Sequence, residues 1–370
     1  MVSGQKQSAA LARESLVDRV EDERPATFGT ELVYHGSNSV QWSVFLKSLV
    51  AGKFSTPENL LYSQTAVAAR LTVTDWRVMV GPSSQEFGTK LAKRLGLPLL
   101  AVTTTEFPDG EIKYRFDEKL DGLQVLLAQS TYPPADQHYM QLFLASHHMS
   151  QEGAKVHAVI PYLGYARQGK AFLPGEIVSL GIIAHLLRSV GVQRVSTVDM
   201  HSAEGLALFS MPVYSVSAIP GLAQYVKTHV KLDDPVAVAP DAGSVKRTEA
   251  FAALYGAKII KLKKGRDRVT GRIKIEADKL PVKGKDCVIV DDVITTGGTV
   301  AASTEVLKRS GARKVVSACV HAVLLGETYD KLIKAGVDEI IGTNTVPSRV
   351  SKVDATEPMA AYLRTIIAEK

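Results

Sequence analysis

The 370-residue sequence contains only two cysteines, Cys287 and Cys319, and both lie in apolar runs. Two thiols cannot build a disulfide framework or a four-thiolate zinc site, so we expect small buried core residues and a reducing compartment. The sequence also lacks the roughly 20-residue apolar run of a membrane-spanning helix and the apolar core of a signal peptide. These absences predict a cytoplasmic protein that does not bind membranes.

The sequence also lacks a large excess of positive or negative charge. Lys and Arg number 44 against 38 Asp and Glu, and the resulting net charge of +6 is small for this length. Such a balance does not by itself indicate nucleic-acid binding, and it would suit an anionic small substrate equally well. Hydrophobic residues make up 45% of the chain, which is enough for a substantial core. The length predicts two domains of ordinary size.

The first 75 residues differ in pattern from the rest of the chain. Residues 9–23 are loosely amphipathic, and residues 29–64 mix turn residues with aromatics in no clear period. We expect residues 1–75 to form an extension, either an appendage or a strip docked on the main body, and assign it no function.

From Trp76 onward, apolar runs typical of strands alternate with stretches typical of helices, which predicts βαβ units and a parallel sheet. The alternation starts again after Ile219-Pro220, so we expect domains at 76–219 and 220–350 and a helix within 351–370. Ser84 is the expected cap of the first helix. The predicted strands are 77–80, 99–102, 124–128, 155–160, 194–198, 236–239, 258–262, 287–290, 315–319 and 339–341, and the predicted helices are 85–95, 138–151, 177–190, 244–254, 299–310 and 328–335.

The clearest group of functional candidates follows the strand that ends at Val290. Ligands of open parallel sheets bind beyond the carboxyl ends of the strands. Glycines there let backbone N–H groups approach a phosphate, and a helix N-terminus adds partial positive charge. Acids can accept hydrogen bonds from ribose hydroxyls. The segment therefore predicts a sugar-phosphate site rather than a plain strand–helix turn with acidic caps. Its candidates are Asp291, Asp292, Thr295, Thr296, Gly297, Gly298 and Thr299.

Other polar segments also follow predicted strands, and each has a plainer alternative. An aromatic and an Asp-Gly turn at 107–111 would suit a nucleotide base or an isolated hairpin. His201 would suit a ligand site or a hydrogen-bonded structural role. The basic cluster at 261–268 would suit catalysis or a solvated surface, and it lacks the aromatics and recognition module of a nucleic-acid site. The candidates are Phe107, Asp109, Gly110, Glu111, Arg167, Gln168, His201, Asp241, Lys264 and Arg266.

The segment at 287–299 resembles the fingerprint of proteins that bind 5-phosphoribosyl-1-diphosphate (PRPP), namely type I phosphoribosyltransferases and PRPP synthetases. The segments at 107–115, 161–170, 197–202, 240–247 and 261–268 resemble the PRPP synthetases in the same order along the chain. These matches span about residues 77–350 and look nearer to the archaeal type. The resemblance implies an α/β fold of two tandem type I phosphoribosyltransferase-like domains, each a mostly parallel sheet flanked by helices. It also implies transfer of the diphosphoryl group of Mg-ATP to the 1-hydroxyl of ribose 5-phosphate, giving PRPP and AMP for nucleotide biosynthesis.

The resemblance also implies roles for the candidates, and it implies a homo-oligomer. ATP would be held by Phe107, Asp109, Gly110, Glu111, Arg167 and Gln168, and Mg²⁺ by His201 and Asp241. Ribose 5-phosphate would be held by Arg266, Asp291, Asp292, Thr295, Thr296, Gly297, Gly298 and Thr299. Lys264 and Arg266 would be catalytic, with Lys263 as an alternative register for the lysine.

The chain departs from the family pattern at four positions, of which Ser244 in place of a common Gly is a mild change. Gly169 stands where the family usually has Asp, and Ser210 and Tyr214 stand where many members have acids. These departures keep open a non-catalytic regulatory subunit of a synthetase complex. A PRPP-consuming phosphoribosyltransferase is the other alternative, but it leaves 107–111 and 167–168 without a role.

Overall fold

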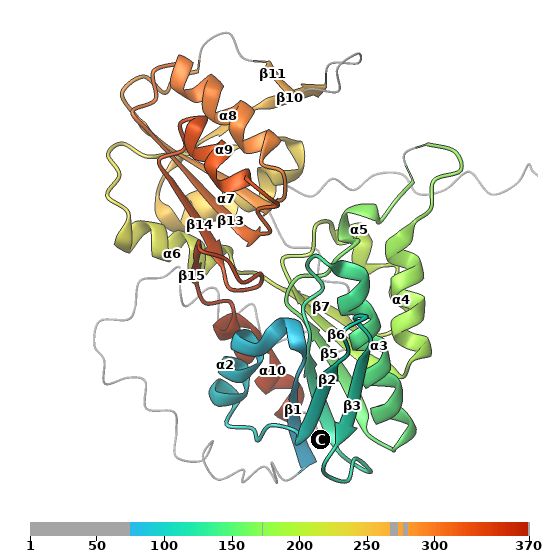
Figure 1. Ribbon diagram of the computed structural model, residues 1–370. Coiled ribbons are helices and arrows are strands. Elements are labelled where there is room, and N and C mark those ends of the chain that lie inside the picture. The colour runs from blue at the N-terminus through green and yellow to red at the C-terminus, as the bar shows by residue number, and fades with distance from the viewer. Residues whose placement is uncertain (1–74, 172, 267–272, 277–279, 369–370) are drawn as a thin grey trace, which may run out of the picture. The chain divides into compact units, whose positions relative to one another are not determined.

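The described residues of the computed structural model form two parallel sheets flanked by helices, as predicted (Figure 1). They comprise 75–171, 173–266, 273–276 and 280–368, and all belong to one compact unit, Arg70–Lys370. The predicted helix at 9–23 and the rest of 1–74 lie outside the described residues.

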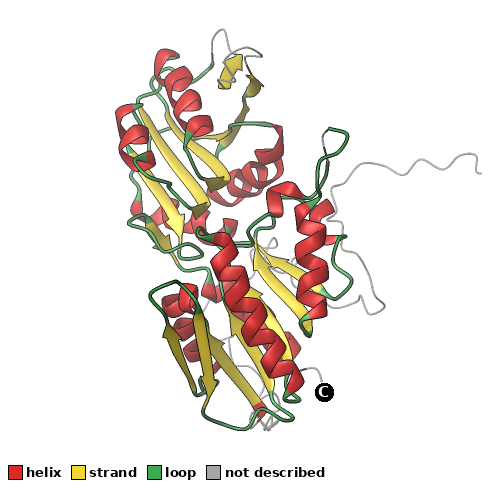
Figure 2. Ribbon diagram, turned by 45° about the vertical axis from the view of Figure 1, so that its right-hand side comes forward, coloured by secondary structure: helices red, strands yellow, loops and turns green. Residues whose placement is uncertain are grey.

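The first sheet contains five parallel strands, and helices cover both of its faces (Figure 2). Leu127 belongs to a core cluster with Leu142 and Leu187, whereas the adjacent Leu126 belongs to another with Leu91 and Leu363. Neighbouring strand residues point to opposite faces, so each face is buried under its own pair of helices. In sheet order the strands are β1 (Trp76–Val80), β4 (Gln124–Ala128), β5 (Lys155–Ile160), β6 (Val192–Val198) and β7 (Val213–Val216), with α3 (Ala135–Gln151) and α4 (Ser179–Ser189) on one face and α2 (Gln85–Leu95) and α10 (Thr356–Ala368) on the other.

The second sheet contains six parallel strands and is covered in the same way. Val288 clusters with Leu222 and Phe251, and the adjacent Ile289 clusters with Leu307 and Leu332. In sheet order the strands are β15 (Ser351–Val353), β14 (Glu339–Thr343), β13 (Lys314–Ala322), β12 (Asp286–Ile294), β8 (Val236–Ala239) and β9 (Lys258–Lys261), with α6 (Ile219–His229) and α7 (Val245–Tyr255) on one face and α8 (Gly298–Arg309) and α9 (Thr328–Lys334) on the other.

Two antiparallel hairpins and a short helix complete the described elements. Strands β2 (Val102–Glu106) and β3 (Ile112–Phe116) pair with each other, as do β10 (Lys263–Arg266) and β11 (Ile273–Glu276). Helix α5 (Ala203–Leu206) follows β6. The β2–β3 pair confirms a hairpin around the Asp-Gly turn.

Most predicted elements are confirmed to within a few residues, but three predictions were wrong. The strand expected at 99–102 is absent from the described structure, because Leu99 makes only an isolated bridge with Val78. Ser84 does not cap the first helix, since its Oγ instead accepts a hydrogen bond from the backbone N–H of Ser130 at 2.7 Å. Strand β12 does not stop at Val290 and runs through both acids to Ile294.

The C-terminal helix α10 packs beside α2 of the first half, although it follows β15 of the second sheet in the chain (Figure 1). Arg94 of α2 fixes the start of α10 by donating to the Asp354 carboxylate and to Thr356 Oγ1, both at 2.9 Å. The division into domains at 219 and 220 stays a prediction.

Cys287 and Cys319 are both fully buried in the second sheet, which confirms their expected place in the core. In the part of the chain that the structure describes, every helix is too short or too polar to cross a membrane.

A buried ion pair at the amino end of β12 yields a stability prediction. The Asp286 side chain is 1% exposed and accepts from Arg313 Nη2 at 2.6 Å and from the backbone N–H of Asp233 at 2.7 Å. We expect Arg313→Met to lower the free energy of unfolding at pH 7, because the buried carboxylate of Asp286 loses its main partner. Chemical denaturation measures this, with the exposed Arg309→Met as control.

The same pair fixes the sign of the pH dependence. The hydrogen bond from Arg313 lowers the pKa of Asp286 below its ordinary value. A lowered native-state pKa means that the pair stabilises the fold above the ordinary pKa of Asp, near 4, and that this stabilisation is lost as the pH falls through the lower native value. The stability difference between wild type and Arg313→Met should therefore shrink below about pH 4. A difference that stays constant down to pH 2 would contradict this account.

Candidate active site

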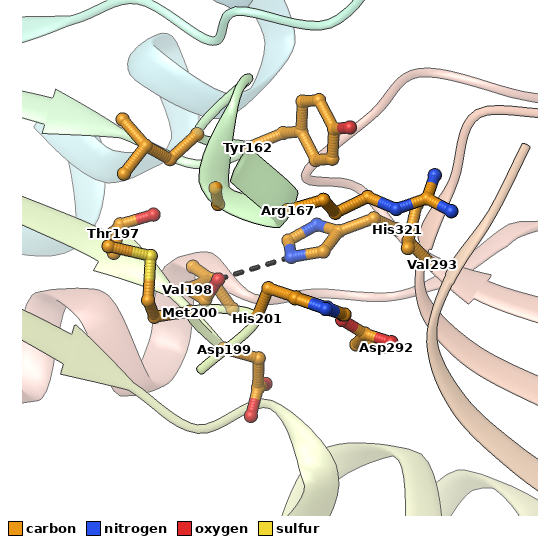
Figure 3. Close-up of a pocket in the computed structure, with 12 residues that line it drawn as sticks. Tyr162, Arg167, Thr197, Val198, Asp199, Met200, His201, Asp292, Val293 and His321 are labelled. Carbon is orange, nitrogen blue, oxygen red and sulfur yellow. Dashed lines mark hydrogen bonds and ion pairs between the residues drawn. The ribbon is translucent and has the colours of Figure 1, made fainter. Parts of the chain in front are cut away.

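Side chains at the carboxyl ends of strands from both sheets line one pocket (Figure 3). The first sheet contributes residues after β5 and at the end of β6, and the second contributes residues from β12 and β13. This is the location that the strand-end rule predicts for a ligand site. The lining residues are Tyr162, Leu163, Ala166, Arg167, Thr197, Val198, Asp199, Met200, His201, Asp292, Val293 and His321.

Asp292 is the electrostatic centre of this pocket. Its side chain is 6% exposed, and His201 Nδ1 lies 2.6 Å from its Oδ2. Arg247 Nη1 approaches the other carboxylate oxygen at 3.5 Å. Although burial opposes ionisation, the hydrogen bond from His201 and the positive charge of Arg247 hold the pKa of Asp292 below its ordinary value. Asp292 therefore carries a negative charge at neutral pH.

Asp291 lies beside this charge and behaves in the opposite way. Its pKa is well above the ordinary value because the side chain is buried and because Asp292 is charged. One carboxyl oxygen of Asp291 accepts from the backbone N–H of Asp292 at 3.0 Å. The two adjacent carboxyls therefore resist double ionisation, and the negative charge is favoured on Asp292.

The loop after β12 leads directly into the N-terminus of α8. Gly297 takes a left-handed conformation, with φ of 69°, just before the helix begins at Gly298. A Cβ at Gly297 would lie 2.9 Å from a methyl of Thr328, so glycine is required both for its φ and for space. The backbone carbonyl of Thr295 accepts from Leu325 N–H at 3.0 Å, which fixes the loop. A fixed loop ahead of a helix N-terminus suits an anionic phosphate.

The segment after β5 reaches across to this loop. Arg167 Nη1 donates to Thr295 Oγ1 at 3.4 Å, which joins a predicted ATP residue to a predicted ribose 5-phosphate residue. Gln168 turns elsewhere, since its Oε1 accepts from Ser179 Oγ at 2.7 Å. The neighbouring Gly169, one of the departures from the family, ends the short helical turn that carries Arg167.

The end of β6 is held tightly where it presents His201. Asp199 has a positive φ of 37°, and its carboxylate accepts from the backbone N–H of Ala218 at 2.6 Å and from Ser217 Oγ at 3.1 Å. Burial raises the pKa of Asp199 to about 6. The backbone N–H of Met200 donates to Ser215 Oγ at 2.8 Å. These bonds fix the backbone from which the imidazole of His201 extends.

Asp241 follows β8 and organises the start of α7. Its carboxylate accepts from the backbone N–H of Ser244 at 3.1 Å, and Ser244 Oγ accepts in return from the N–H of Asp241. The negative charge of Asp241 also helps to raise the pKa of Asp291, so the two acids influence each other. Among the described residues, no three His, Cys, Asp or Glu side chains gather as a metal cage.

The predicted nucleotide turn stands apart from the pocket. Phe107 is 43% exposed, and Asp109, Gly110 and Glu111 are exposed as well. The described hydrogen bonds of this turn stay within it: Gly110 N–H donates to the Phe107 carbonyl, and Glu111 N–H donates to Asp109 Oδ1 at 3.1 Å. In the described part of the chain, the residues that line the pocket include none of these four.

Lys264 and Arg266 lie on strand β10, where the resemblance implied a catalytic loop. Lys264 pairs with Ile275 and Arg266 with Ile273 in the antiparallel hairpin. Strand β11 of this hairpin contacts α8, the helix that begins at the candidate phosphate loop. The side chains of Lys264 and Arg266 lie outside the described part of the structure.

Three site residues were absent from the sequence-based assignments: Arg247, Asp199 and His321. Arg247 lies in the segment that begins at Asp241, just after β8. This position near the end of a strand was the signal in the sequence that could have identified it. Asp199 was visible as the acid two residues before His201. His321 had no sequence signal beyond its place after an apolar run, because its importance depends on contacts between the two sheets.

The departures from the family pattern at Gly169, Ser210 and Tyr214 all lie outside the pocket lining. Tyr214 on β7 stacks on Tyr362 of α10, with ring centroids 3.8 Å apart and planes 9° apart. An acid at that position would lose this contact, so Tyr214 has a packing role in this chain. Ser210 lies in the turn before β7.

Comparisons with known proteins match this architecture over most of the chain. The family described as the N-terminal domain of ribose phosphate pyrophosphokinase matches residues 76–191, and the phosphoribosyl synthetase-associated domain matches residues 268–370. The ribose-phosphate pyrophosphokinase of Sulfurisphaera tokodaii is 35% identical over 291 residues, which cover 78% of this chain and 99% of that protein. That of Methanothermobacter thermautotrophicus is 36% identical over 284 residues, which cover 76% and 98%. The crystal structure of phosphoribosylpyrophosphate synthetase from Mycobacterium smegmatis, 30% identical, has a TM-score of 0.72 and covers 80% of this chain and 100% of its own.

Proposed function

Because this chain belongs to the ribose-phosphate pyrophosphokinase family, we propose that its strand-end pocket forms PRPP from ATP and ribose 5-phosphate. The enzyme is a diphosphotransferase of nucleotide biosynthesis. The observation that carries the proposal is the 2.6 Å contact between His201 of the first sheet and Asp292 of the second. It joins the predicted nucleotide side to the predicted sugar side in one pocket.

We assign the sugar side to Asp291, Asp292 and the loop that precedes α8. The charged Asp292 can accept a hydrogen bond from a ribose hydroxyl, and Asp291 places a second carboxyl group beside it. The backbone of Thr295–Thr299, together with the N-terminus of α8, supplies donors for the 5-phosphate. The hydroxyls of Thr295, Thr296 and Thr299 are suited to the same oxygens, with Gly297 and Gly298 allowing close approach and Arg266 as a further cation.

We assign the nucleotide side to Arg167 and Gln168 in the pocket region and to Phe107, Asp109, Gly110 and Glu111 on the β2–β3 turn. Support for Arg167 comes from its contact with Thr295. Support for the exposed turn comes from the family pattern, and an exposed aromatic is free to stack on a base.

The donor set suits a Mg²⁺ ion that arrives with the nucleotide. His201 and Asp241 are the residues that would hold it, and Mg²⁺ commonly uses one or two protein ligands together with substrate phosphates. The absence of a three-ligand cage among the described residues agrees with such a shared site. Bound there, the ion would neutralise phosphate charge.

In the proposed reaction, the 1-hydroxyl oxygen of ribose 5-phosphate bonds to the β-phosphorus of ATP. The bond between that phosphorus and the oxygen bridging to the α-phosphorus breaks, AMP leaves, and the 1-hydroxyl loses its proton. Such a transfer needs positioning and charge stabilisation more than covalent catalysis. Lys264 and Arg266 would stabilise the charge that builds up on the transferred group.

The test is AMP and PRPP formation by the purified full-length chain from ATP, Mg²⁺ and ribose 5-phosphate, with no nucleobase present. Equal amounts of AMP and PRPP are expected. A phosphoribosyltransferase would form neither AMP nor PRPP, because the mixture contains no base and no diphosphate. A non-catalytic regulatory subunit would also form neither product. Either result would contradict the proposal. A cytoplasmic homo-oligomer is part of the same proposal, and size-exclusion chromatography with light scattering measures the assembly.

A further inference from the structure

His321 of β13 connects the two sheets at the back of the pocket, and no catalytic role has so far been assigned to it. The side chain is 4% exposed. Its Nε2 lies 3.1 Å from the backbone carbonyl oxygen of Val198 at the end of β6 (Figure 3). Its Nδ1 lies 2.8 Å from Thr345 Oγ1. Tyr162 packs against the ring edge-on, with centroids 5.0 Å apart and planes at 71°. Groups from both sheets therefore fix the position and the tilt of this imidazole.

The hydrogen-bond partners determine which nitrogen carries the proton. A carbonyl oxygen only accepts, so Nε2 must be the donor to Val198. Burial lowers the pKa of His321 to about 4, so the ring is neutral at pH 7 and its Nδ1 is an acceptor. Thr345 Oγ1 supplies the matching donor. The geometry thus requires a neutral ring with its proton on Nε2.

The hydrogen bond from His321 Nε2 acts on the active site through the backbone of Val198. The next residues are Asp199, which has the strained positive φ, and His201, which contacts Asp292 at 2.6 Å. The other restraints on this strand end, from Ser215, Ser217 and Ala218, all come from the first half of the chain. His321 lies on the same sheet as Asp292, since β12 and β13 are paired neighbours.

We propose that His321 is a positioning residue for diphosphoryl transfer, which by donating its Nε2–H to the Val198 carbonyl holds the end of β6 in place so that His201 stays against Asp292. The inference rests on the proposed function, because it concerns the approach of the nucleotide side to the sugar side. A displacement of about 1 Å in such a constellation can cost on the order of 10² in rate. In this proposal His321 acts through the backbone of β6, by way of its bond to the Val198 carbonyl.

A pair of amide substitutions separates the two hydrogen bonds of the ring. Glutamine places its amide nitrogen near the position of Nε2, so His321→Gln retains the donor to Val198. Asparagine reaches only the position of Nδ1, so His321→Asn retains the contact with Thr345 and loses the donor. We expect His321→Asn to lower kcat about tenfold to a hundredfold and to raise the KM for ATP, with the KM for ribose 5-phosphate unchanged. His321→Gln should recover most of the loss.

His157 provides the matched control. It is a buried histidine on β5 whose Nε2 contacts Ser196 Oγ at 2.8 Å, within the first sheet and away from the strand ends. His157→Asn should change the melting temperature without changing either KM. If His321 variants do not fold, Thr345→Val tests the same point, because it removes the hydroxyl that orients the ring and leaves the imidazole in place. It should shift kcat and the KM for ATP in the same direction by a smaller factor.

Two measurements need no substrate and so separate this inference from the proposed function. Hydrogen exchange followed by mass spectrometry should show faster exchange at 199–202 in His321→Asn than in wild type or in His321→Gln. The ¹⁵N shifts of the His321 ring, assigned by difference from His321→Gln, should show the neutral Nε2–H form at pH 7. Equal exchange and equal kinetics in the Asn and Gln variants would overturn the inference, as would the Nδ1–H form. Wild-type protein that forms no PRPP would instead overturn the proposed function.

Discussion

Replacing Lys264 with alanine is expected to lower kcat for PRPP formation by at least about 10²–10³ while leaving the fold intact. The size follows from removing one preorganised donor to charge that develops in the transition state. The fold should survive because Lys264 lies on the two-stranded β10–β11 hairpin and not in either parallel sheet. Steady-state kinetics measure the loss, and an unchanged melting temperature confirms folding.

Lys263→Ala is the matched control, because it removes the same charge from the preceding residue of the same strand. Adjacent strand residues point to opposite sides, so only one of the two lysines can face the substrates. Loss of activity in Lys263→Ala alone would move the catalytic assignment by one residue. Wild-type turnover in both variants would remove this hairpin from the mechanism and contradict the proposed assignment.

The strands buried on both faces could be predicted from the sequence because their pattern is local. Lys155–Ile160 and Val236–Ala239 are short apolar runs with polar boundaries, and both are strands with the predicted bounds. The helix Gln85–Leu95 was equally predictable, since Gly96 ends it in a left-handed conformation. A strand or helix can be predicted from the local sequence when its own pattern of apolar and polar residues determines which side chains are buried.

Elements that depend on distant partners were mispredicted. Acids inside β12 looked like the end of a strand, but Asp292 is tolerated within it because His201 and Arg247, remote in sequence, compensate its burial. Helix α6 was not predicted, and Pro220 occupies its first turn, where proline fits well. The edge strand β7 was missed because its residues are only partly buried.

The residues of the candidate site also divide into those that the local sequence identifies and those whose roles depend on distant contacts. The loop around Gly297 could be recognised because glycines, hydroxyls and acids coincide within one short segment. Arg247 and His321 could not be ranked, since their roles come from contacts with Asp292 and with the Val198 carbonyl across the fold. The comparisons establish the family, whereas the individual roles of the site residues stay predictions that the substitutions test.

Asp292→Asn is expected to lower kcat/KM for ribose 5-phosphate by about 10² or more, whereas Asp291→Asn should cost much less. Asp292 carries the buried negative charge, so the amide leaves Arg247 without its counter-charge, weakens the acceptor for His201 Nδ1 and weakens the acceptor for a ribose hydroxyl. Burial and the charge of Asp292 raise the pKa of Asp291 well above its ordinary value, and an amide oxygen can still accept from the N–H of residue 292.

The two substitutions are matched in size, burial and strand, so their comparison isolates the charge. Kinetics at pH 7 should therefore rank Asp292→Asn well below Asp291→Asn at similar melting temperatures. Equal losses would mean that both carboxyls ionise when substrates bind, and the reverse order would place the working anion at Asp291. Because Asp292, unlike Asp291, has a described contact with His201 of the first half, a loss confined to Asp292 would also tie catalysis to the junction between the sheets and not to the sugar loop by itself.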